Sequence, residues 1–366
     1  MNDKPTILHT EVSDGWGGQE IRILGEMLGM KGRGYDVLLA APEHTKIYKR
    51  AVDAGIESFA VGMDKAGFVK GVIGLVRIIK DRRVSIINTH SSRDSWMGSI
   101  AGRAAGIKVL RSRHISSRLR TDLLTRLVYG PLCDAIITTG EYIKHQLTDG
   151  LGIRPDKVHP IATGIDVEKF ASARGELLRA ELGLDNSAII LGTAAALRGW
   201  KGHEFTVKAM PAVLEEFPGV RLVLAGEGPM RPYIESWVRE YGLEDKVFFL
   251  GHREDVAEVI QSFDISMLTS WASEGIPQFA LQSMAAGKPV VGTRVGGIPE
   301  VVIDGVNGFV VPSYDFGAVA EAVIKLLRDP ARMKDMGEAG RKMAFERHTT
   351  DMMLDSIVGL YKTILT

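Results

Sequence analysis

The segment from Ser270 to Glu300 carries the residues best suited to chemistry, because a carboxylate stands there before a short helix. Pro277 is typical of a first helical turn, where the missing N–H has no intrahelical partner, and Gly287 and Pro289 are stop signals. These residues predict a helix over about 277–286. Glu274 then lies just before a helix start, whose free N–H groups and positive dipole end favour an anion such as phosphate.

Two cations follow a strand of small apolar residues. Arg198 and Lys201 occupy the glycine-containing loop 197–202. The planar fork of arginine and the compact charge of lysine both suit a diphosphate. Alone, such a loop is better interpreted as solvated charge. Together with the helix start near Pro277, phosphate binding is the better interpretation, because two independent features converge on one group.

Glycine-rich turns and strand-end histidines are further candidates. Gly15-Trp16-Gly17-Gly18 precedes a helix and lets a ligand approach its N–H groups, although a tight βα turn explains it equally well. Gly226-Glu227-Gly228-Pro229 is first of all a turn. Neither has the Gly-x-Gly-x-x-Gly spacing of a dinucleotide site. His90 and His114 follow buried strands, where a histidine is more often structural than catalytic.

Several kinds of site find little support. The sequence has no His-x-x-x-His, a single cysteine (Cys133) and no Gly-x-Ser-x-Gly, so neither a dedicated metal site nor a hydrolase elbow is indicated. Lysine plus arginine and aspartate plus glutamate both total 45, and this zero net charge gives no general attraction to nucleic acid.

Short apolar runs alternate with helical patterns along almost the whole chain, which predicts an α/β fold with parallel sheets. With 366 residues and 45% hydrophobic content, two cores are expected. The expected strands are 6–10, 36–40, 84–90, 109–112, 135–139, about 157–162, 188–195, 221–225, 247–250, 265–269, 289–293 and 308–311. The expected helices are 18–32, 68–82, 93–105, 119–130, 140–149, 202–216, 229–242, 253–262 and 277–286.

This alternation predicts two Rossmann-like halves, residues 1–167 and 168–349, with a final helix at about 350–366 packing back on the first half. Ligands of open α/β sheets bind outside the carboxyl ends of the strands, so two such halves predict a cleft between them. The start of the chain lacks the apolar core of a signal peptide, and no apolar run approaches the ~20 residues that span a bilayer. A cytoplasmic protein is expected.

One stretch of this neutral chain is strongly basic. Between residues 103 and 126, only Asp122 opposes seven cations: Arg103, Lys108, Arg111, Arg113, Arg118, Arg120 and Arg126. Such a surface suits anionic lipid head groups or an acidic acceptor, and an ordinary charged helix face is the equal alternative.

Taken together, these motifs resemble the family 4 retaining glycosyltransferases, which have the two-Rossmann GT-B fold. The resemblance covers essentially the whole chain and is strongest over 249–312. It lies in an ordered set of segments: 17–20 (Gly-Gly-Gln-Glu), 163–166 with Phe170, 201–202 (Lys-Gly), 226–229, Gly251 with Arg253 and Asp255, 273–275 (Ser-Glu-Gly), 285–291 and 296–300.

The resemblance implies a metal-independent hexosyltransferase that binds a nucleoside-diphosphate sugar in the C-terminal half and its acceptor in the N-terminal half. Glu274, Arg198, Lys201 and His114 are the implied catalytic residues, and no cofactor or protein nucleophile is needed. The implied donor-binding residues are Gly17, Gly18, Gly226, Arg253, Pro277, Gln278, Phe279 and Gln282.

Three positions depart from the family pattern. Gln282 stands where a second carboxylate usually contacts the ribose, and an amide still offers a donor and an acceptor there. Pro277 often is glycine in the family, so the amides of Gln278 and Phe279 would carry the contact to the donor. Ala196 replaces the usual arginine, and Arg198 substitutes for it if the two positions share one face of a strand.

The expected process is surface polysaccharide or lipopolysaccharide synthesis on a glycan or lipid-linked acceptor, with the protein peripheral on the inner face of the membrane through residues 103–126. Two alternatives stay open: a non-catalytic nucleotide-sugar-binding protein and a GT-B-fold sugar-nucleotide epimerase. A nicotinamide oxidoreductase ranks third, because the dinucleotide spacing is missing.

Overall fold

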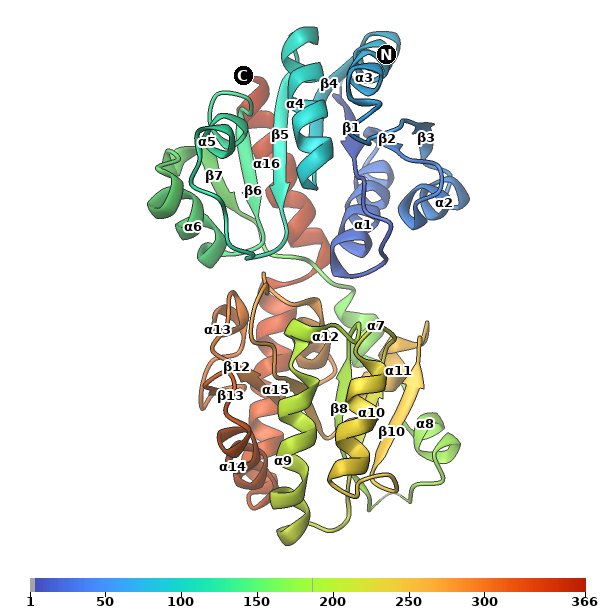
Figure 1. Cartoon of the computed structure of the whole chain (residues 1–366), viewed down its shortest axis with the longest axis vertical. Coiled ribbons are helices and arrows are strands. Elements are labelled where there is room, and N and C mark those ends of the chain that lie inside the picture. The colour runs from blue at the N-terminus through green and yellow to red at the C-terminus, as the bar shows by residue number, and fades with distance from the viewer. Residues whose placement is uncertain (1–3, 186) are drawn as a thin grey trace. The chain divides into compact units, whose positions relative to one another are not determined.

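The computed structural model describes residues 4–185 and 187–366 and contains two compact units (Figure 1). The first unit comprises the chain up to Gly164 together with Thr350–Thr366, and the second comprises Ile165–Thr349. The predicted boundary between residues 167 and 168 falls inside helix α7 (Val167–Ala171), which belongs entirely to the second unit.

The first unit is built on a seven-stranded parallel sheet of order β3-β2-β1-β4-β5-β6-β7. Its strands are β1 (Thr6–Thr10), β2 (Asp36–Ala41), β3 (Glu57–Ala60), β4 (Val84–Thr89), β5 (Lys108–Arg113), β6 (Ala135–Thr138) and β7 (Val158–Pro160). The central strands are mostly buried, as their continuous apolar sequences require, whereas the edge strand β3 is partly exposed. Its helices are α1 (Gly18–Gly32), α2 (Lys46–Asp53), α3 (Phe68–Asp81), α4 (Ser92–Ala105), α5 (Leu123–Tyr129), α6 (Glu141–Leu151) and α16 (Thr350–Leu365), with a 3-10 turn at Pro155–Lys157.

Helix α16 completes the core of this first unit, although it lies far away in the sequence. Its buried face packs with α1 and with strand residues such as Ile7 and Leu39: Met353, Leu354, Ile357, Leu360 and Tyr361. Gly29 of α1 permits the close approach, because a Cβ at that position would lie 2.4 Å from Cδ1 of Leu354.

The second unit repeats the architecture with a six-stranded parallel sheet of order β10-β9-β8-β11-β12-β13. The strands are β8 (Ile189–Ala194), β9 (Val220–Ala225), β10 (Val247–Gly251), β11 (Ile265–Leu268), β12 (Val290–Thr293) and β13 (Gly308–Val311). Besides α7, the helices are α8 (Glu176–Glu181), α9 (His203–Glu216), α10 (Arg231–Glu240), α11 (Val256–Gln261), α12 (Gln278–Ala285), α13 (Ile298–Val301), α14 (Phe316–Leu327) and α15 (Pro330–Arg347), with a 3-10 turn at Gly199–Lys201.

The predicted α/β class with two doubly wound parallel sheets is confirmed. Several predicted helices are shorter than expected. Helices α10 and α11 begin at Arg231 and Val256 instead of residues 229 and 253. Helix α5 begins at Leu123 instead of residue 119, because the Asp122 carboxylate accepts a hydrogen bond from the Thr125 N–H and caps it there. Helix α12 begins at Gln278, and Pro277 is its extended N-cap residue (φ −76°, ψ 124°) and not part of its first turn.

Both sheets have a switch point, where the strand order reverses direction. It lies between β1 and β4 in the first unit and between β8 and β11 in the second. Ligands of open α/β sheets bind at the carboxyl ends of the strands beside such a point. The loops that follow these four strands are therefore the places to look for a site.

Candidate functional site

An ion pair spans the switch point of the second sheet. Nζ of Lys201, from the turn after β8, lies 2.7 Å from Oε1 of Glu274, from the loop after β11. The Glu274 residue is only 5% exposed, and Ser270 Oγ donates a second hydrogen bond of 2.6 Å to the same oxygen. Two of the predicted site residues are thus in direct contact.

The loop after β11 is held against the turn after β8 by several further bonds. The Trp271 N–H donates to the Trp200 carbonyl (2.9 Å), and its indole N–H donates to the Gly199 carbonyl (2.8 Å). Thr269 Oγ1 donates to the Gly202 carbonyl at 2.8 Å. The Lys201–Glu274 geometry therefore rests on a network around both residues and not on the ion pair alone.

Three glycines are required by close backbone approaches in this region. A Cβ on Gly202 (φ +65°) would lie 2.0 Å from the Thr269 carbonyl oxygen, and one on Gly226 (φ +145°) would lie 2.0 Å from that of Ala195. A Cβ on Gly228 would lie 2.4 Å from the Leu197 oxygen. The turn at 226–229 therefore packs directly on the segment that carries Arg198, which explains why glycine occurs twice in it.

Arg198 lies beyond the end of β8, in an exposed loop. The expectation that Ala196 and Arg198 share one face of a strand is therefore wrong, since β8 ends at Ala194 and strand alternation does not extend to either residue. The Arg198 guanidinium lies 5.2 Å from the centre of the Trp200 ring. Its charge stays on the surface of the loop, on the same turn as Lys201.

The start of α12 gathers four more of the predicted donor-binding residues. Pro277 and Phe279 are buried, while Gln278 and Gln282 are half-buried. The residue before Glu274, Ser273, has a left-handed backbone (φ +62°), a conformation that costs free energy for a non-glycine residue and is concentrated at functional sites.

Arg253 has a different environment from the other predicted donor residues. Its guanidinium binds both carboxylate oxygens of Asp255 (2.7 and 2.6 Å) and both of Glu181 (2.8 and 3.1 Å). These four bonds connect the start of α11 to α8. A donor phosphate would have to compete with two carboxylates for this side chain, so Arg253 as a donor contact stays a prediction.

In the first unit, the Gly17-Gly18 turn is organised by two buried glutamates. The Gly17 N–H donates to Oε2 of Glu20 (2.9 Å), which caps α1. Glu11, just after β1, accepts hydrogen bonds from the N–H groups of Val12 and Ser13 (2.7 and 2.8 Å). Gln19 Nε2 and Ser91 Oγ also donate to Glu11, so the carboxylate connects the loops on both sides of the first switch point.

Three histidines form a continuous chain at the carboxyl edge of the first sheet. Nδ1 of His9 lies 2.9 Å from Nε2 of His90, and Nδ1 of His90 lies 2.9 Å from Nε2 of His114. His9 lies in β1, and His90 and His114 directly follow the neighbouring strands β4 and β5. All three are at most 8% exposed. Burial lowers the pKa of His9 to about 3 and lowers the pKa values of His90 and His114 well below the ordinary range. The three rings are therefore neutral at pH 7.

Asp94 supports this edge from α4. Its Oδ2 accepts hydrogen bonds from the His90 N–H (2.8 Å) and from Thr10 Oγ1 (2.9 Å). Burial, with the nearby negative charge of Glu11, raises the pKa of Asp94 to about 7. Burial also raises the pKa of Glu11.

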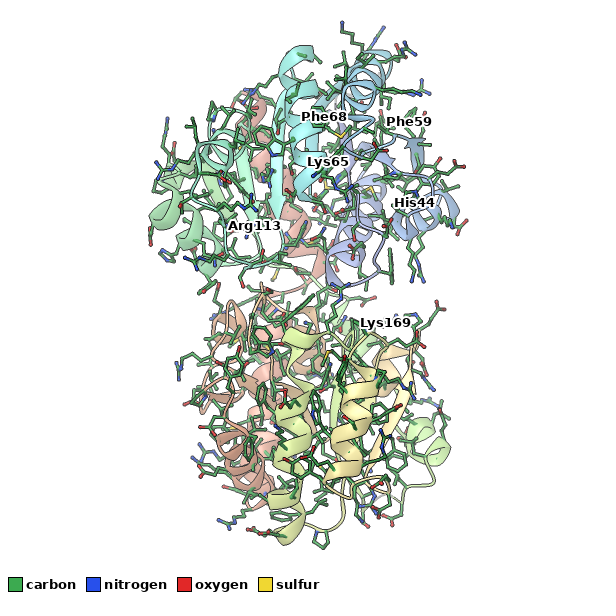
Figure 2. All side chains as sticks on the ribbon, viewed as in Figure 1. His44, Phe59, Lys65, Phe68, Arg113 and Lys169 are labelled. Atoms are coloured by element: carbon green, nitrogen blue, oxygen red, sulfur yellow. The ribbon has the colours of Figure 1, made fainter. Side chains whose placement is uncertain are left out.

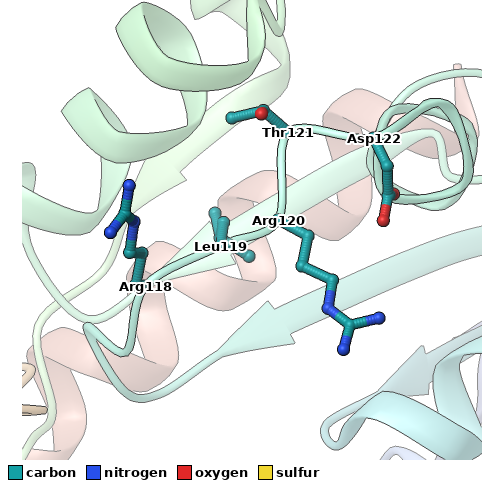
Figure 3. Close-up of a pocket in the computed structure, with 5 residues that line it drawn as sticks. All are labelled: Arg118, Leu119, Arg120, Thr121 and Asp122. Atoms are coloured by element: carbon teal, nitrogen blue, oxygen red, sulfur yellow. The ribbon is translucent and has the colours of Figure 1, made fainter.

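The basic segment 103–126 divides into two parts. Arg111 and Arg113, the second labelled in Figure 2, bind the Tyr129 hydroxyl, and Arg103 pairs with Asp134 at 3.0 Å. Arg118, Arg120 and Arg126 are exposed. Figure 3 shows the side chains of Arg118 and Arg120 extending in different directions from their loop. Residues 118–122 line a pocket of about 510 Å³. Fewer than the seven predicted cations therefore contribute to a basic surface, because Arg103, Arg111 and Arg113 have partners within the protein.

Among residues 4–185 and 187–366, which the structure describes, no group of three or more His, Cys, Asp or Glu side chains is arranged to hold a metal ion. No helix in the same residues combines the length and apolarity needed to cross a bilayer.

Sequence reasoning missed His9, Glu11, Glu26 and Asp94 as partners in the first-unit cluster. His9 and Glu11 stand at the end of a predicted strand, where a search of strand ends would find them. Glu26 and Asp94 lie within helices and resemble ordinary surface carboxylates, so only their burial, at 1% and 0% exposed, distinguishes them.

The two doubly wound sheets place the protein in the GT-B class. A crystal structure of HepE from Anabaena in complex with UDP has a TM-score of 0.87 at 20% identity, covering 98% of this chain and all of that one. A glycosyltransferase from Rickettsia africae has a TM-score of 0.90 at 19% identity, covering 100% of this chain and 99% of that one. At these identities the likeness concerns the fold alone.

The sequence itself identifies the family. Residues 16–169 match the Glycosyltransferase Family 4 profile, and residues 175–343 match the profile of glycosyl transferases group 1. The chain belongs to glycosyltransferase family 4, as the resemblance predicted, and is a glycosyltransferase.

Two curated relatives agree with this assignment. A Bacillus subtilis (strain 168) protein named "Putative glycosyltransferase EpsD" is 29% identical over 348 residues, covering 89% of each protein. The Escherichia coli UDP-Gal:alpha-D-GlcNAc-diphosphoundecaprenol alpha-1,3-galactosyltransferase is 26% identical over 278 residues, covering 71% of each protein.

Proposed function

We propose that this protein is a retaining, metal-independent glycosyltransferase that moves a hexose from a UDP-sugar to a hydroxyl of a lipid-linked or glycan acceptor. The observation that carries the proposal is the Lys201–Glu274 pair (2.7 Å) across the switch point of the second sheet. It puts a cation and a carboxylate together where open α/β sheets bind ligands. Complexes of the HepE protein with UDP and with UDP-glucose support UDP as the nucleotide.

In the proposed donor site, Arg198 and Lys201 neutralise the diphosphate, and the start of α12 at Gln278 and Phe279 adds backbone N–H groups. The bond from the anomeric carbon to the diphosphate breaks while the acceptor oxygen forms its bond to that carbon, and the hydroxyl proton leaves with the diphosphate. Negative charge grows on UDP during this step, so fixed positive groups accelerate it.

Glu274 and Gln282 divide the remaining contacts in the proposal. The carboxylate of Glu274, kept in place by Lys201 and Ser270, accepts hydrogen bonds from hydroxyls of the donor sugar. The amide of Gln282 contacts the ribose. In the first unit, Gly17 and Gly18 approach the phosphates, and His114 contacts the reacting sugar.

Arg253 takes a smaller part in this proposal. Because Asp255 and Glu181 already occupy its guanidinium, its proposed role is to hold the loop after β10 in place, beside Gly226, whose N–H donates to the Gly251 carbonyl at 2.7 Å. A direct phosphate contact would need one of the two carboxylates to leave.

In the proposal, the protein meets its acceptor at an anionic membrane surface, and the process that it serves is surface polysaccharide or lipopolysaccharide synthesis. Helix α5 exposes Leu123 (81%) and Leu124 (63%), and the exposed Arg118, Arg120 and Arg126 lie on or just before it. Apolar side chains beside arginines are typical of segments that lie on anionic membranes. The lipid diphosphate in the name of the E. coli relative supports an acceptor of this kind.

A thermal-shift screen followed by a transfer assay tests the proposal. The melting temperature is expected to rise with a UDP-sugar at saturation, because a ligand bound only by the folded state stabilises it. Arg198→Ala should lower kcat by about 100-fold, in line with the loss of one group that stabilises transition-state charge. Arg239→Ala, on the exposed end of α10, is the matched control and should be unchanged.

Three outcomes would contradict the proposal. The first is that no nucleotide sugar shifts the melting curve. The second is that Arg198→Ala transfers sugar at the normal rate. The third is that the donor is converted to its epimer without any acceptor. The last result would favour the epimerase alternative instead.

A further inference from the structure

The three-histidine chain of the first unit continues to a buried carboxylate. Nε2 of His9 lies 4.0 Å from Oε1 of Glu26, which is on α1 and 1% exposed. At the other end, Nδ1 of His114 is buried and has no hydrogen-bond partner among the described residues. The chain thus connects a carboxylate inside the unit to an unpartnered ring nitrogen at the carboxyl edge of the sheet.

The rings lie in the arrangement that N–H···N hydrogen bonds require. The planes of His9 and His90 differ by 7°, and those of His90 and His114 differ by 25°. Both pairs have ring centres 5.2 Å apart and ring nitrogens 2.9 Å apart, so the rings meet edge to edge and not face to face. Each contact needs one N–H donor and one lone pair.

Only two proton arrangements satisfy both contacts with neutral rings. Either every ring carries its proton on Nδ1, or every ring carries it on Nε2. Any mixture puts two protons or two lone pairs face to face across 2.9 Å. The tautomer of His114 is therefore tied to the tautomer of His9, two rings away.

Glu26 distinguishes the two arrangements. Its Oε1 accepts hydrogen bonds from two donors, Asn88 Nδ2 at 3.4 Å and the Tyr361 hydroxyl at 3.3 Å. Arg22, one turn earlier on α1, adds a buried positive charge whose guanidinium is held by Thr163 Oγ1 and the Ile161 carbonyl. These groups favour an ionised carboxylate, although burial opposes them and raises the pKa of Glu26.

An ionised carboxylate beside His9 attracts an N–H and repels a lone pair. The 4.0 Å separation is too long for a hydrogen bond, so the effect is electrostatic, and in a buried site it is weakly screened. His9 then carries its proton on Nε2, and the same follows for His90 and His114. Asp94 does not disturb this order, since it binds the backbone N–H of His90 and not the ring.

We propose that Glu26 is a positioning residue that holds His9, His90 and His114 in the Nε2–H tautomer, so that Nδ1 of His114 presents a lone pair to a substrate hydroxyl. The contact between His114 and a substrate hydroxyl rests on the proposed function, whereas the order of the tautomers does not. His114 is then an acceptor that selects for a hydroxyl group on the sugar or the acceptor. An analogue with a carbonyl or an ether oxygen at that position would face a lone pair and be rejected.

Nitrogen-15 NMR of the histidine rings tests the proposal on the full chain without substrate. In the wild type, His9, His90 and His114 should all show the Nε2–H tautomer at pH 7. Glu26→Gln removes the charge, and the Nδ1–H tautomer should then appear in all three rings in equal proportion. Tyr361→Phe removes one donor to Glu26 but keeps the carboxylate, so it is the matched control and should leave the tautomers unchanged.

His203, buried in the second unit, provides an internal reference that should not respond to any of these changes. A wild-type His114 with its proton on Nδ1 would overturn the proposal. So would tautomers that change in one ring alone, or a Glu26→Gln spectrum identical to the wild type. The wild-type spectrum decides the order even if Glu26→Gln fails to fold.

Kinetics separates this inference from the proposed function. Glu26→Gln should lower kcat/KM for transfer from UDP-glucose by about three- to tenfold, the effect of one misdirected hydrogen bond. Tyr361→Phe should not. If no sugar is transferred by the wild type while the tautomers are as expected, the proposed function alone fails. If transfer is normal but the tautomers are not coupled, the inference alone fails.

Discussion

Lys201 and Glu274 are 73 residues apart, and their side chains meet at 2.7 Å across the switch point of the second sheet. The lysine is therefore both a candidate phosphate ligand and the partner of a buried carboxylate. Because Lys201 is also the partner of Glu274, a variant of this lysine tests stability as well as catalysis. Arg198, which is exposed on the same turn, separates the two.

Lys201→Ala should lower the free energy of unfolding by about 1–3 kcal/mol, because Glu274 would keep only Ser270 as a partner in a buried position. Urea denaturation measures this loss. Lys208→Ala breaks a solvent-accessible pair with Glu204 of similar length (2.6 Å) and should cost less than about 0.5 kcal/mol. Equal losses of unfolding free energy in the two variants would show that the buried Lys201–Glu274 pair stabilises the protein no more than the solvent-accessible Lys208–Glu204 pair does.

Asp94→Asn should change how stability depends on pH. The folded protein raises the pKa of Asp94 from 3.8 to about 7, so the protonated form is favoured on folding. The wild type therefore loses stability relative to the variant as the pH rises from about 4 to about 7, by about 1.4 kcal/mol for each unit of pKa shift. Below that window the difference is constant, and above it the difference is constant again.

The asparagine oxygen can still accept the hydrogen bonds from the His90 N–H and Thr10, which isolates the effect of charge. Urea denaturation of both proteins between pH 4 and pH 8 measures the difference. A difference that stays constant across this range would show that Asp94 is ionised throughout.

Gly202→Ala should destabilise the second unit by about 2–4 kcal/mol. The new Cβ would lie 2.0 Å from the Thr269 carbonyl oxygen, and the backbone has a positive φ of 65°. Gly25→Ala, inside α1 with nothing within 4 Å, is the comparison and should stabilise by about 0.5–1 kcal/mol. Thermal unfolding that does not distinguish the two variants would contradict the predicted clash.

Leu123→Ser combined with Leu124→Ser should reduce binding to vesicles that contain phosphatidylglycerol by about tenfold or more, since each exposed leucine loses the apolar area that it buries in the lipid. Cosedimentation measures the bound fraction. Arg118→Glu with Arg120→Glu should have a similar effect on anionic vesicles and none on neutral ones.

Leu177→Ser is the control for surface hydrophobicity, because this leucine of α8 is 70% exposed in the second unit. Wild-type protein that fails to sediment with anionic vesicles would remove the support for a membrane-bound acceptor. Equal loss in Leu177→Ser would show that the α5 surface is not specific.

Strongly patterned elements were predictable from the sequence. The bounds of β1, β13 and α1 agree residue by residue with expectation, because an apolar run or a helical period dominates each of them. Strand β3 (Glu-Ser-Phe-Ala) was missed, since an edge strand of four half-exposed residues has neither pattern. The early start predicted for α5 was wrong because the decisive signal was one capping aspartate.

The site was predictable one residue at a time but not as a set of contacts. Glu274, Lys201 and His114 could be proposed from their places after strands. Nothing local in the sequence indicates that Lys201 pairs with Glu274 or that His114 bonds to His90, because the strand order creates both contacts. The burial that makes Glu26 and Asp94 unusual likewise depends on packing between distant segments.

The place of α16 has a consequence for biosynthesis. Residues 350–366 supply a wall of the first unit's core, yet they leave the ribosome only after all of Ile165–Thr349. The second unit is continuous and has its full set of strands at that time, whereas α1 still exposes the apolar residues on which Leu354 packs. The first-synthesised unit should therefore reach its final stability last, and chaperones that bind exposed apolar surface have the most opportunity to act on it.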